Sequence, residues 1–522
     1  MKKFAAIVVL GGAATVLGYG QAVVYNSLNS SLGNLVTLDG SPTALHRYNN
    51  AGFLIGTIAS VPNALALTKV LGNYYVTTGL TLVQVTPLGA VTPVATAPSS
   101  SQWTALAPDG LGNLLLADNK AHAVWRVNLQ TSAASIVGNY PATSAGQNED
   151  VGIIVDPSGN YLILSDNNAT LSMFSMTPSG TVVPVTLTGF AATNTNGKLI
   201  RYNGVYAFIS YGDNAICTIT FTVPPGSATA PVATVAELAS SITPSGTPRG
   251  LTANLDSGAL FFATSANTVQ TVELKTNGSG VCAPNCSSLT IAYPTQPRDV
   301  IEEAYGELPY LAFGSIWTTG VYIFNSADVA ASYSVSFYNP DGSVATAPFA
   351  GGGTSALKGT LPPRGMTYVE ASNPSAGTTS TVSGLISADP SISVQGLFRD
   401  TINGTYWEAG VPSSLGGNGF SVPFDFTTFV PTGQQLFTGL AISNFSPSNS
   451  ATVTCVATNQ SGTVIPNALT IPTLLPLGQF SGYSFSPLYG LSGTLTCTST
   501  TRVAAFGVRS LGSTFSLLPV VY

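Results

Sequence analysis

A short phrase that recurs along the first 300 residues constrains the fold of this chain more than any other feature. Each copy has a glycine turn, usually with an adjacent asparagine, followed by a run of β-forming residues that ends near Asp, Gly or Ser. The turn glycines lie at positions 33, 72, 112, 159, 204 and 258, so the spacing runs from 39 residues (33 to 72) to 54 residues (204 to 258). Repeats of this length are typical of one four-stranded propeller blade. The pattern predicts an all-β chain that begins with a β-propeller of six, or else seven, blades.

The punctuation within one copy supports four strands per repeat. The fourth copy contains four runs of strand-forming residues. Turns at Pro157–Asn160 and Thr177–Gly180 follow the first and third runs, because such turns need the fixed φ of Pro and the positive φ of Gly. The runs are Gly152–Asp156, Tyr161–Ser165, Leu171–Met176 and Thr181–Leu187. The segment from Pro294 to Gly314 follows the last copy, and it either closes the ring or begins an incomplete seventh blade.

The clearest copy, Leu106–Val127, resembles the repeats of the NHL-repeat propeller family. The Asn-His-Leu tripeptide of that family is absent, because Ala121-His122-Ala123 stands in its place. The resemblance implies a propeller and no particular activity, since this scaffold carries binding proteins and enzymes alike.

The last 200 residues repeat at a longer period. Thr319–Asn325 is similar to Thr438–Asn444, and Gln395–Arg399 is similar to Ala505–Arg509. Short alternating strands in each copy predict two immunoglobulin-like β-sandwich domains. The pair resembles tandem β-sandwich modules at the ends of bacterial secreted proteins, a resemblance that implies no chemistry. The predicted organisation is a signal peptide at 1–22, the propeller at 23–312 and sandwiches at 313–415 and 416–522, with a flexible junction around 413–419.

The N-terminus predicts export. Lys2 and Lys3 precede an uncharged apolar stretch, Phe4–Leu17, and small residues allow cleavage after Ala22. The alternative is an N-terminal membrane anchor. No later stretch is apolar for long enough to span a membrane as a helix. We therefore expect a secreted, periplasmic or cell-surface protein without a transmembrane segment once the signal is removed.

Charge excludes several classes of function. Only 7% of the residues are charged, the net charge is -6, and no basic run is present that could neutralise phosphates. Nucleic acid is therefore excluded as a partner. Hydrophobic residues make up 44% of the chain, which also excludes an intrinsically disordered protein.

The five cysteines fit an oxidising compartment. Aligning the two C-terminal repeats places Cys455 at Val335 and Cys497 at Ala388, both apolar core positions, so we expect a Cys455–Cys497 disulfide. A local Cys282–Cys286 bridge is expected in Cys-Ala-Pro-Asn-Cys, where zinc would lack its other ligands. Cys217 alternates with its neighbours like a buried strand residue and is predicted to be a free thiol.

Candidate binding residues end the second strand of three repeats. They are Asp118, Asn119, Asp166, Asn167, Asp213 and Asn214. Side chains of this kind cap turns by bonding to the backbone, which is the favoured interpretation. Their oxygens could also bind a sugar or, weakly, calcium. The two histidines, His46 and His122, are expected at the blade surface. No catalytic residues, resident metal or cofactor are predicted.

One acidic cluster allows a second interpretation. Glu302, Glu303 and Glu307 lie near Arg298 and Asp299 at the predicted domain junction. Paired carboxylates can perform acid/base chemistry, but a solvated turn is the favoured interpretation.

Together these observations favour a secreted binding or scaffolding protein that uses the propeller as a platform for an unidentified protein or carbohydrate ligand. The alternatives are a propeller-type lactonase or lyase with a divalent metal, and a structural cell-surface or adhesion protein.

Overall fold

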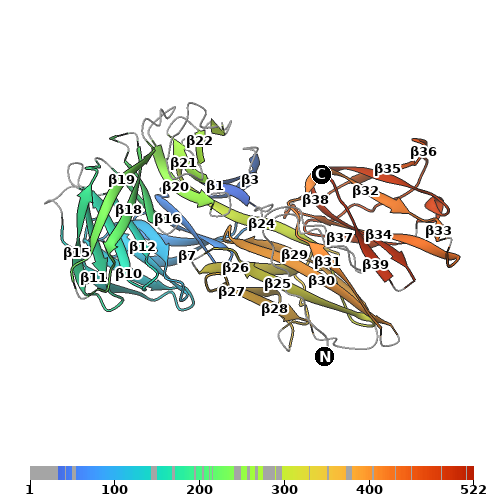
Figure 1. Ribbon diagram of the computed structural model, residues 1–522, viewed down its shortest axis with the longest axis horizontal. Coiled ribbons are helices and arrows are strands. Elements are labelled where there is room, and N and C mark those ends of the chain that lie inside the picture. The colour runs from blue at the N-terminus through green and yellow to red at the C-terminus, as the bar shows by residue number, and fades with distance from the viewer. Residues whose placement is uncertain are drawn as a thin grey trace.

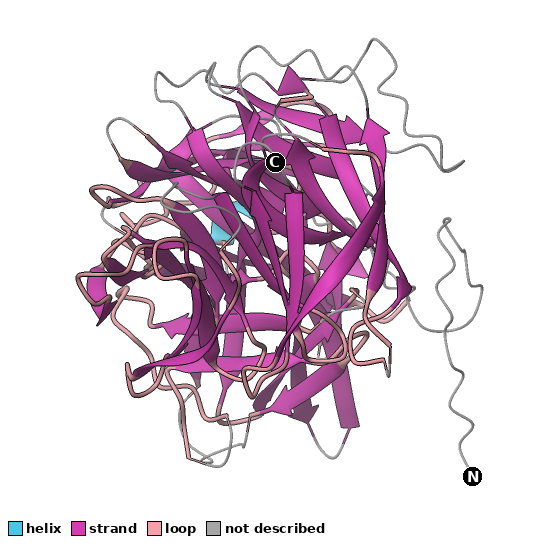
Figure 2. Ribbon diagram, turned by 90° about the vertical axis from the view of Figure 1, so that its left-hand side faces the viewer, coloured by secondary structure: helices cyan, strands magenta, loops and turns pink. Residues whose placement is uncertain are grey.

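The computed structural model shows an all-β architecture, with a propeller at one end and two further groups of strands at the other (Figure 1). The one helical element is a single 3₁₀ turn, η1 (Ser486–Leu488), in the part of the chain that the structure describes (Figure 2). No helix in that part is long and apolar enough to cross a membrane. The structure describes residues 33–40, 43–49, 54–142, 150–166, 171–192, 195–202, 205–210, 212–213, 215–227, 229–239, 248–254, 259–264, 268–273, 288–289, 297–327, 330–349, 352–371, 379–402, 405–429, 431–447, 449–483, 485–512 and 514–522.

The propeller consists of groups of four antiparallel strands. The group at the chain ends contains β24 (Pro297–Phe313), β1 (Gly33–Asp39), β2 (Ala44–Asn49) and β3 (Leu54–Ser60). The next contain β4 (Ala66–Val70), β5 (Asn73–Thr77), β6 (Thr81–Val85) and β7 (Val91–Thr96), then β8 (Trp103–Pro108), β9 (Asn113–Asp118), β10 (Ala123–Asn128) and β11 (Ala134–Asn139). Two more contain β12 (Asp150–Val155), β13 (Tyr161–Asp166), β14 (Leu171–Met176) and β15 (Val182–Gly189), then β16 (Thr195–Tyr202), β17 (Val205–Ser210), β18 (Ala215–Val223) and β19 (Val232–Ala239). The last contains β20 (Pro248–Asn254), β21 (Ala259–Thr264), β22 (Thr268–Glu273) and β23 (Ser288–Leu289).

The first strands of these groups form a closed ring. Each contacts the next, in the order β24, β4, β8, β12, β16, β20 and back to β24. The recurring phrase of the sequence lies in the second strands β1, β5, β9, β13, β17 and β21. In the first group, β24 pairs antiparallel with β1, from Gly33↔Ala304 to Asp39↔Pro297. The two ends of the propeller segment therefore meet in one sheet, which fixes the ring.

Turn glycines explain how neighbouring groups approach so closely. Gly89 and Gly180 lie between the third and fourth strands of their groups, at φ values of +91° and +93°. A Cβ atom would lie 2.2 Å from the Ile58 carbonyl oxygen at Gly89 and 2.1 Å from the Val137 carbonyl oxygen at Gly180. Both carbonyls belong to the outermost strand of the preceding group. Only glycine fits these turns, because they need both a positive φ and an absent side chain.

The second half of β24 leaves the propeller and enters what we call the middle unit, residues 304–412. Its two sheets are β27-β26-β29-β24 and β28-β25-β30-β31. Their buried side chains, which include Val335, Ile386, Val321 and Val394, share one core. The new strands are β25 (Trp317–Asn325), β26 (Ala331–Tyr338), β27 (Ala356–Leu361), β28 (Met366–Glu370), β29 (Ser380–Ala388), β30 (Ile392–Ile402) and β31 (Thr405–Pro412).

The last unit, residues 417–522, is built around the long strand β38. Its strands are β32 (Gly417–Asp425), β33 (Thr428–Phe429), β34 (Gln434–Asn444), β35 (Val453–Asn459), β36 (Val464–Ile465), β37 (Gln479–Gly482), β38 (Ser492–Leu511) and β39 (Thr514–Leu518). The predicted Cys455–Cys497 disulfide is confirmed, and its residues face each other across β35 and β38. In the middle unit Val335 faces Ile386, whereas Ala388 faces Tyr333. The repeat alignment was thus two residues out, a shift that leaves the side chain on the same face of the sheet.

The middle and last units pack through aromatic side chains. Trp317 stacks on Phe398 with ring centroids 4.4 Å apart, and Phe398 contacts Phe515 of the last unit at 5.2 Å. In the segment around 413–419, where a flexible junction is expected, Ser414 exchanges two backbone hydrogen bonds with Glu307 and Gly417 begins β32. Gly416 in this segment lets the chain lie close to β38, because a Cβ there would lie 2.5 Å from the Val503 carbonyl oxygen.

Candidate functional site

Among the aspartates singled out by the repeats, Asp118 caps a turn through backbone hydrogen bonds. Asp118 ends β9 and is fully buried. Its Oδ1 accepts hydrogen bonds from the backbone N–H groups of Gln102 (2.9 Å), Lys120 (3.1 Å) and Ala121 (2.9 Å). Its Oδ2 accepts one from Trp125 Nε1 at 3.2 Å. These bonds tie the end of the second strand to the strands on either side of it, so Asp118 has a structural role of its own.

The other members of that set differ in their surroundings. Asp166 ends β13 and is 3% exposed, and Asn119 is buried beside Asp118. Asp213 Oδ2 accepts a hydrogen bond from Ser210 Oγ at 2.5 Å. Asn167 and Asn214 lie outside the described residues, as do Cys282 and Cys286. Within the described ranges, no three His, Cys, Asp or Glu side chains lie close enough together to hold a metal ion.

A similar side-chain pair occurs in the first group, where the sequence-based expectation for histidine was wrong for His46. His46 is 2% exposed rather than at the blade surface, and its Nδ1 pairs with Asp39 Oδ2 at the end of β1. Asp39 and His46 are seven residues apart, as are Asp118 and Trp125. A third-strand ring nitrogen thus meets the second-strand carboxylate in both groups, which buries the imidazole.

The Glu cluster is the feature that sequence reasoning misjudged most. Glu302, Glu303 and Glu307 lie on β24 and are 6%, 0% and 1% exposed, so the solvated turn expected there is wrong. The first half of the strand belongs to the propeller sheet and the second half to the middle unit, and strands β34 and β38 of the last unit also contact it. Charged and apolar residues come in pairs over Arg298–Tyr305 instead of alternating, so no period-two strand pattern marks this segment in the sequence.

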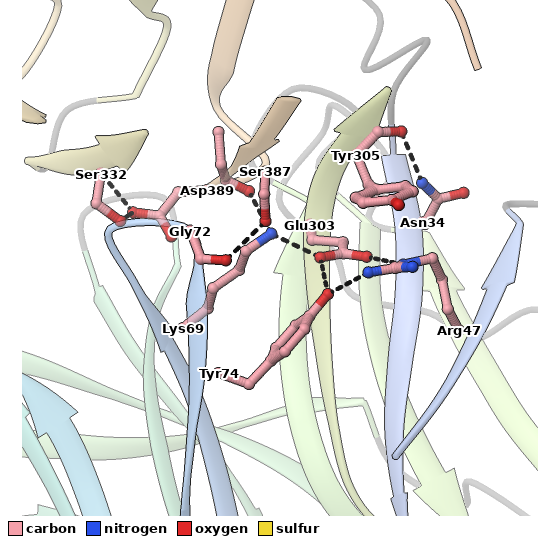
Figure 3. Close-up of polar contacts among 11 residues, drawn as sticks. Asn34, Arg47, Lys69, Gly72, Tyr74, Glu303, Tyr305, Ser332, Ser387 and Asp389 are labelled. Carbon is pink, nitrogen blue, oxygen red and sulfur yellow. Dashed lines mark hydrogen bonds and ion pairs between the residues drawn. The ribbon is translucent and has the colours of Figure 1, made fainter. Parts of the chain in front are cut away.

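Glu303 is the centre of a buried polar network (Figure 3). Arg47 Nε donates to its Oε1 at 2.5 Å, and Lys69 Nζ donates to its Oε2 at 2.6 Å. Tyr74 Oη donates to the same Oε2 at 2.5 Å and accepts from Arg47 Nη2 at 2.6 Å. The Arg47 guanidinium lies 3.5 Å from the centre of the Tyr305 ring. We call Arg47, Lys69, Tyr74 and Glu303 the Glu303 cluster.

The electrostatics of the cluster fix its protonation. Burial alone would raise the pKa of Glu303, but Arg47 and Lys69, with hydrogen bonds from Lys69 and Tyr74, lower it to about 2. Burial lowers the pKa of Lys69, partly offset by Glu303, and burial raises the pKa of Tyr74. A carboxylate held ionised in this way is a poor proton acceptor near neutral pH, so the cluster is not suited to general base catalysis.

The cluster connects the propeller to the middle unit. Lys69 Nζ also donates to the Ala388 carbonyl oxygen at 3.2 Å, and Ser387 Oγ donates to the Gly72 carbonyl oxygen at 2.9 Å. Gly72 has a φ of +80°, and a Cβ there would lie 2.5 Å from Ser334 Cβ. Beside this contact, the Ser332 N–H and Oγ both donate to Asp389 Oδ2, at 2.6 and 3.0 Å (Figure 3). The turn after β4 therefore docks directly on β26 and β29.

A second charged contact lies inside the ring. Lys198 Nζ pairs with Asp299 Oδ1 and donates to the Val300 carbonyl oxygen at 3.0 Å. Asp299 Oδ2 accepts the Leu67 N–H at 2.9 Å. Gly250 lies in the same place, with room for no side chain, since its Cβ would be 2.5 Å from Asp299 Cα. This contact joins β16, β20, β24 and β4 across the ring.

The propeller has two different ends. The pair Asp39↔Pro297 places the Asp39 turn where β24 begins, and the Asp118 cap likewise bonds to Gln102 just before β8. The Glu303 cluster and the middle unit lie where β24 leaves the ring. The capped turns are therefore at the end of the propeller that faces away from the middle unit.

Comparison with known proteins gives little further guidance. No protein-family model and no curated protein matches this sequence. Among solved structures, virginiamycin B lyase from Staphylococcus aureus is 16% identical over 51% of this chain and 78% of that chain, with a TM-score of 0.34. The calcium-binding protein regucalcin from Agrobacterium tumefaciens is 13% identical over 47% of this chain and 81% of that chain, with a TM-score of 0.32. A luciferin-regenerating enzyme is 13% identical over 46% and 83%, with a TM-score of 0.36. Similarity at this level decides neither an activity nor a ligand.

Proposed function

We propose that this chain is an exported bacterial binding or scaffolding protein. In this proposal residues 1–22 are a signal peptide, the ring is a six-bladed, NHL-like propeller, and the middle and last units are immunoglobulin-like sandwiches. The propeller is the platform for a protein or carbohydrate ligand, and the two C-terminal units hold it in place. A structural role in adhesion at the cell surface is a variant of the same proposal.

One observation supports the proposal: the buried charged groups of the Glu303 cluster attach the propeller to the middle unit. Arg47 and Lys69 form ion pairs with Glu303, and Lys69 also binds the middle unit. All three side chains are buried, so a substrate cannot reach them. A buried, fully paired network of this kind specifies one arrangement of its parts more than it adds stability. In this proposal the network holds the propeller rigidly, so that its opposite end is presented to a ligand.

The ligand site in this proposal is the end with the capped turns. Asp118, Asn119, Asp166, Asn167, Asp213 and Asn214 surround it in the proposed arrangement. Their caps would shape the turns, and weak calcium binding there would be secondary. No catalytic residue, resident metal or cofactor is proposed.

The experiment that tests the proposal measures binding and catalysis on the same protein. Mature protein is assayed against glycan and extracellular-protein panels, against a panel of lactones, and for bound metal by elemental analysis. We expect saturable binding that weakens in Asp166→Ala, with no lactone turnover. Asp341→Ala is the matched control, because Asp341 caps an exposed turn in the middle unit. Turnover that depends on a stoichiometric divalent metal and disappears in Asp166→Ala would replace this proposal with the lactonase or lyase alternative.

A further inference from the structure

Glu307 is a buried carboxyl at the point where the propeller strand meets both C-terminal units. It is 1% exposed, and neither of its carboxyl oxygens has a hydrogen-bond partner among the described residues. Its backbone pairs with Ser414, in the segment that joins the middle and last units, through two hydrogen bonds of 2.9 Å. The side chain is thus fixed in place by the main chain while its polar end has no direct partner.

The polar groups nearest to this carboxyl come from different units. Ser383 on β29 belongs to the middle unit, and Ser443 on β34 belongs to the last unit. Both serines are fully buried, and neither hydroxyl has a partner in the described part of the chain. Gln479 on β37 faces Ser443 in register, and its Nε2 binds the Pro309 carbonyl oxygen on β24. Polar groups of the middle and last units therefore meet at the stretch of β24 that holds Glu307 and Pro309.

The rest of the surroundings is apolar or aromatic. Tyr305, Tyr338, Leu385, Phe445, Leu477 and Ala504 form one buried cluster that spans β24, the middle unit and the last unit. The titratable groups that feel Glu307 are Tyr305, Tyr338 and Tyr522. The arginines of this region, Arg47 and Arg502, act on Tyr305 instead.

Comparison with Glu303 shows what these surroundings do. The two carboxyls are four residues apart on one strand, and both are buried. Paired cations hold the pKa of Glu303 at about 2. Burial raises the pKa of Glu307 to about 8, opposed only in part by Ser443 and Ser383. Glu307 is therefore neutral at pH 6, and its O–H can be donated to a serine hydroxyl.

We propose that Glu307 is a proton-controlled contact that holds the last unit against β24 and the middle unit. Only the neutral carboxyl has an O–H that it can donate to Ser383 Oγ or Ser443 Oγ, the two hydroxyls that act on it, while its carbonyl oxygen can accept from the other. When the proton leaves to solvent, a carboxylate remains in an apolar site without a cation. Such a group is strongly destabilising in place, so the contact opens and admits water.

The test compares Glu307→Gln with wild type over pH 5 to 9. The amide keeps the shape and the hydrogen-bonding groups but cannot ionise. We expect the Tm of wild type to fall relative to that of Glu307→Gln as pH rises. We also expect the protection of the Ser414 and β32 amides, measured against the intrinsic exchange rate at each pH, to fall above pH 8 in wild type alone. Glu370→Gln is the matched control, because Glu370 is a surface group of the middle unit, and it should keep the wild-type profile.

Two results would overturn the proposal. One is a Glu307→Gln protein whose Tm and hydrogen exchange depend on pH as in wild type. The other comes from wild type alone, should the variant not fold: infrared spectra recorded across pH 6 to 9 should lose a protonated-carboxyl band as the pH passes about 8. The absence of such a loss would mean that Glu307 does not carry the proton. In that case Ser383→Ala and Ser443→Ala should also leave the pH profile unchanged.

Discussion

Single carboxylates in this protein have very different consequences for stability, depending on burial. Glu303 is fully buried with two cations, whereas the Arg399 side chain is 22% exposed and its partners Glu370 and Glu408 are 40% and 46% exposed. Exposed pairs contribute about 0–1 kcal/mol because water screens them. Removing one partner of a buried pair leaves a charge in a medium that cannot solvate it. The same type of contact is therefore decisive in one place and nearly neutral in the other.

We predict that Glu303→Gln lowers the free energy of unfolding by about 3–5 kcal/mol, because Arg47 and Lys69 stay buried without a counter-charge. Urea unfolding followed by tryptophan fluorescence measures it. The matched control, Glu408→Gln, should lower it by about 1 kcal/mol or less. Equal, small effects of the two substitutions would mean that the cluster is solvated.

Acid should also expose the role of Glu303. Its pKa is lowered in the folded protein from the ordinary 4.5 to about 2. Between these values the unfolded chain binds a proton that the folded protein does not, so this contribution is fully present above pH 4.5 and is lost as the pH falls toward 2. The loss amounts to about 3 kcal/mol.

The measurement is the free energy of unfolding from pH 6 to 2 in wild type and in Glu303→Gln. Wild type should lose more stability across that range than the variant does. Parallel curves for the two proteins would contradict the assignment of this pH dependence to Glu303.

At the scale of elements, the sequence was most informative where a signal is local. The recurring glycine phrase predicted the second strands, and the turns with Thr-Pro and Gly predicted the hairpins after them, because both depend on backbone preferences of adjacent residues. The contact of Gly89 and Gly180 with the preceding group could not be read from the sequence. It arises only when neighbouring sheets pack against each other.

That contact yields a prediction with a built-in control. Gly180 and Gly159 both have positive φ, +93° and +86°, but only Gly180 lies against a neighbouring strand. Alanine at either position should lower the free energy of unfolding by about 1–2 kcal/mol through backbone strain. Gly180→Ala should lower it by about 1–3 kcal/mol more, because its Cβ overlaps the Val137 carbonyl. Thermal unfolding of both variants measures the difference, and equal losses would mean that the turn is free to move.

Strand β24 shows why the candidate site escaped sequence analysis. Judged from the residues next to them in the sequence alone, its charged residues would be exposed to solvent. The partners of Glu303, Arg47 and Lys69, lie 256 and 234 residues away in the sequence, and no local pattern reports them. The Cys455–Cys497 bridge is also distant, but a repeat alignment made it visible.

At the scale of the whole molecule, β24 belongs to two units at once. Ala304 pairs with Gly33 of the propeller and with Ala388 of the middle unit. The predicted boundary at 312 lies inside this strand. The proposed division of the chain therefore depends on which unit the second half of the strand is assigned to. Its second half supplies Leu308, Leu311 and Phe313 to the core of the middle unit, each at most 2% exposed. It also supplies Glu307, which pairs with Ser414 at the junction of the two C-terminal units.

We therefore predict that two C-terminal fragments differ sharply in folding. A fragment of residues 304–522 keeps the half of β24 that pairs with β29, and it should unfold cooperatively on heating. A fragment of residues 313–522 lacks nearly all of that strand, and each core side chain lost with it, Leu308 and Leu311, would have contributed about 1.5–3 kcal/mol. It should show a lower Tm, poor dispersion of its amide NMR signals and aggregation through the exposed edge of β29. Indistinguishable Tm values for the two fragments would place the division at 312 and would make β24 a passive connection between independent units.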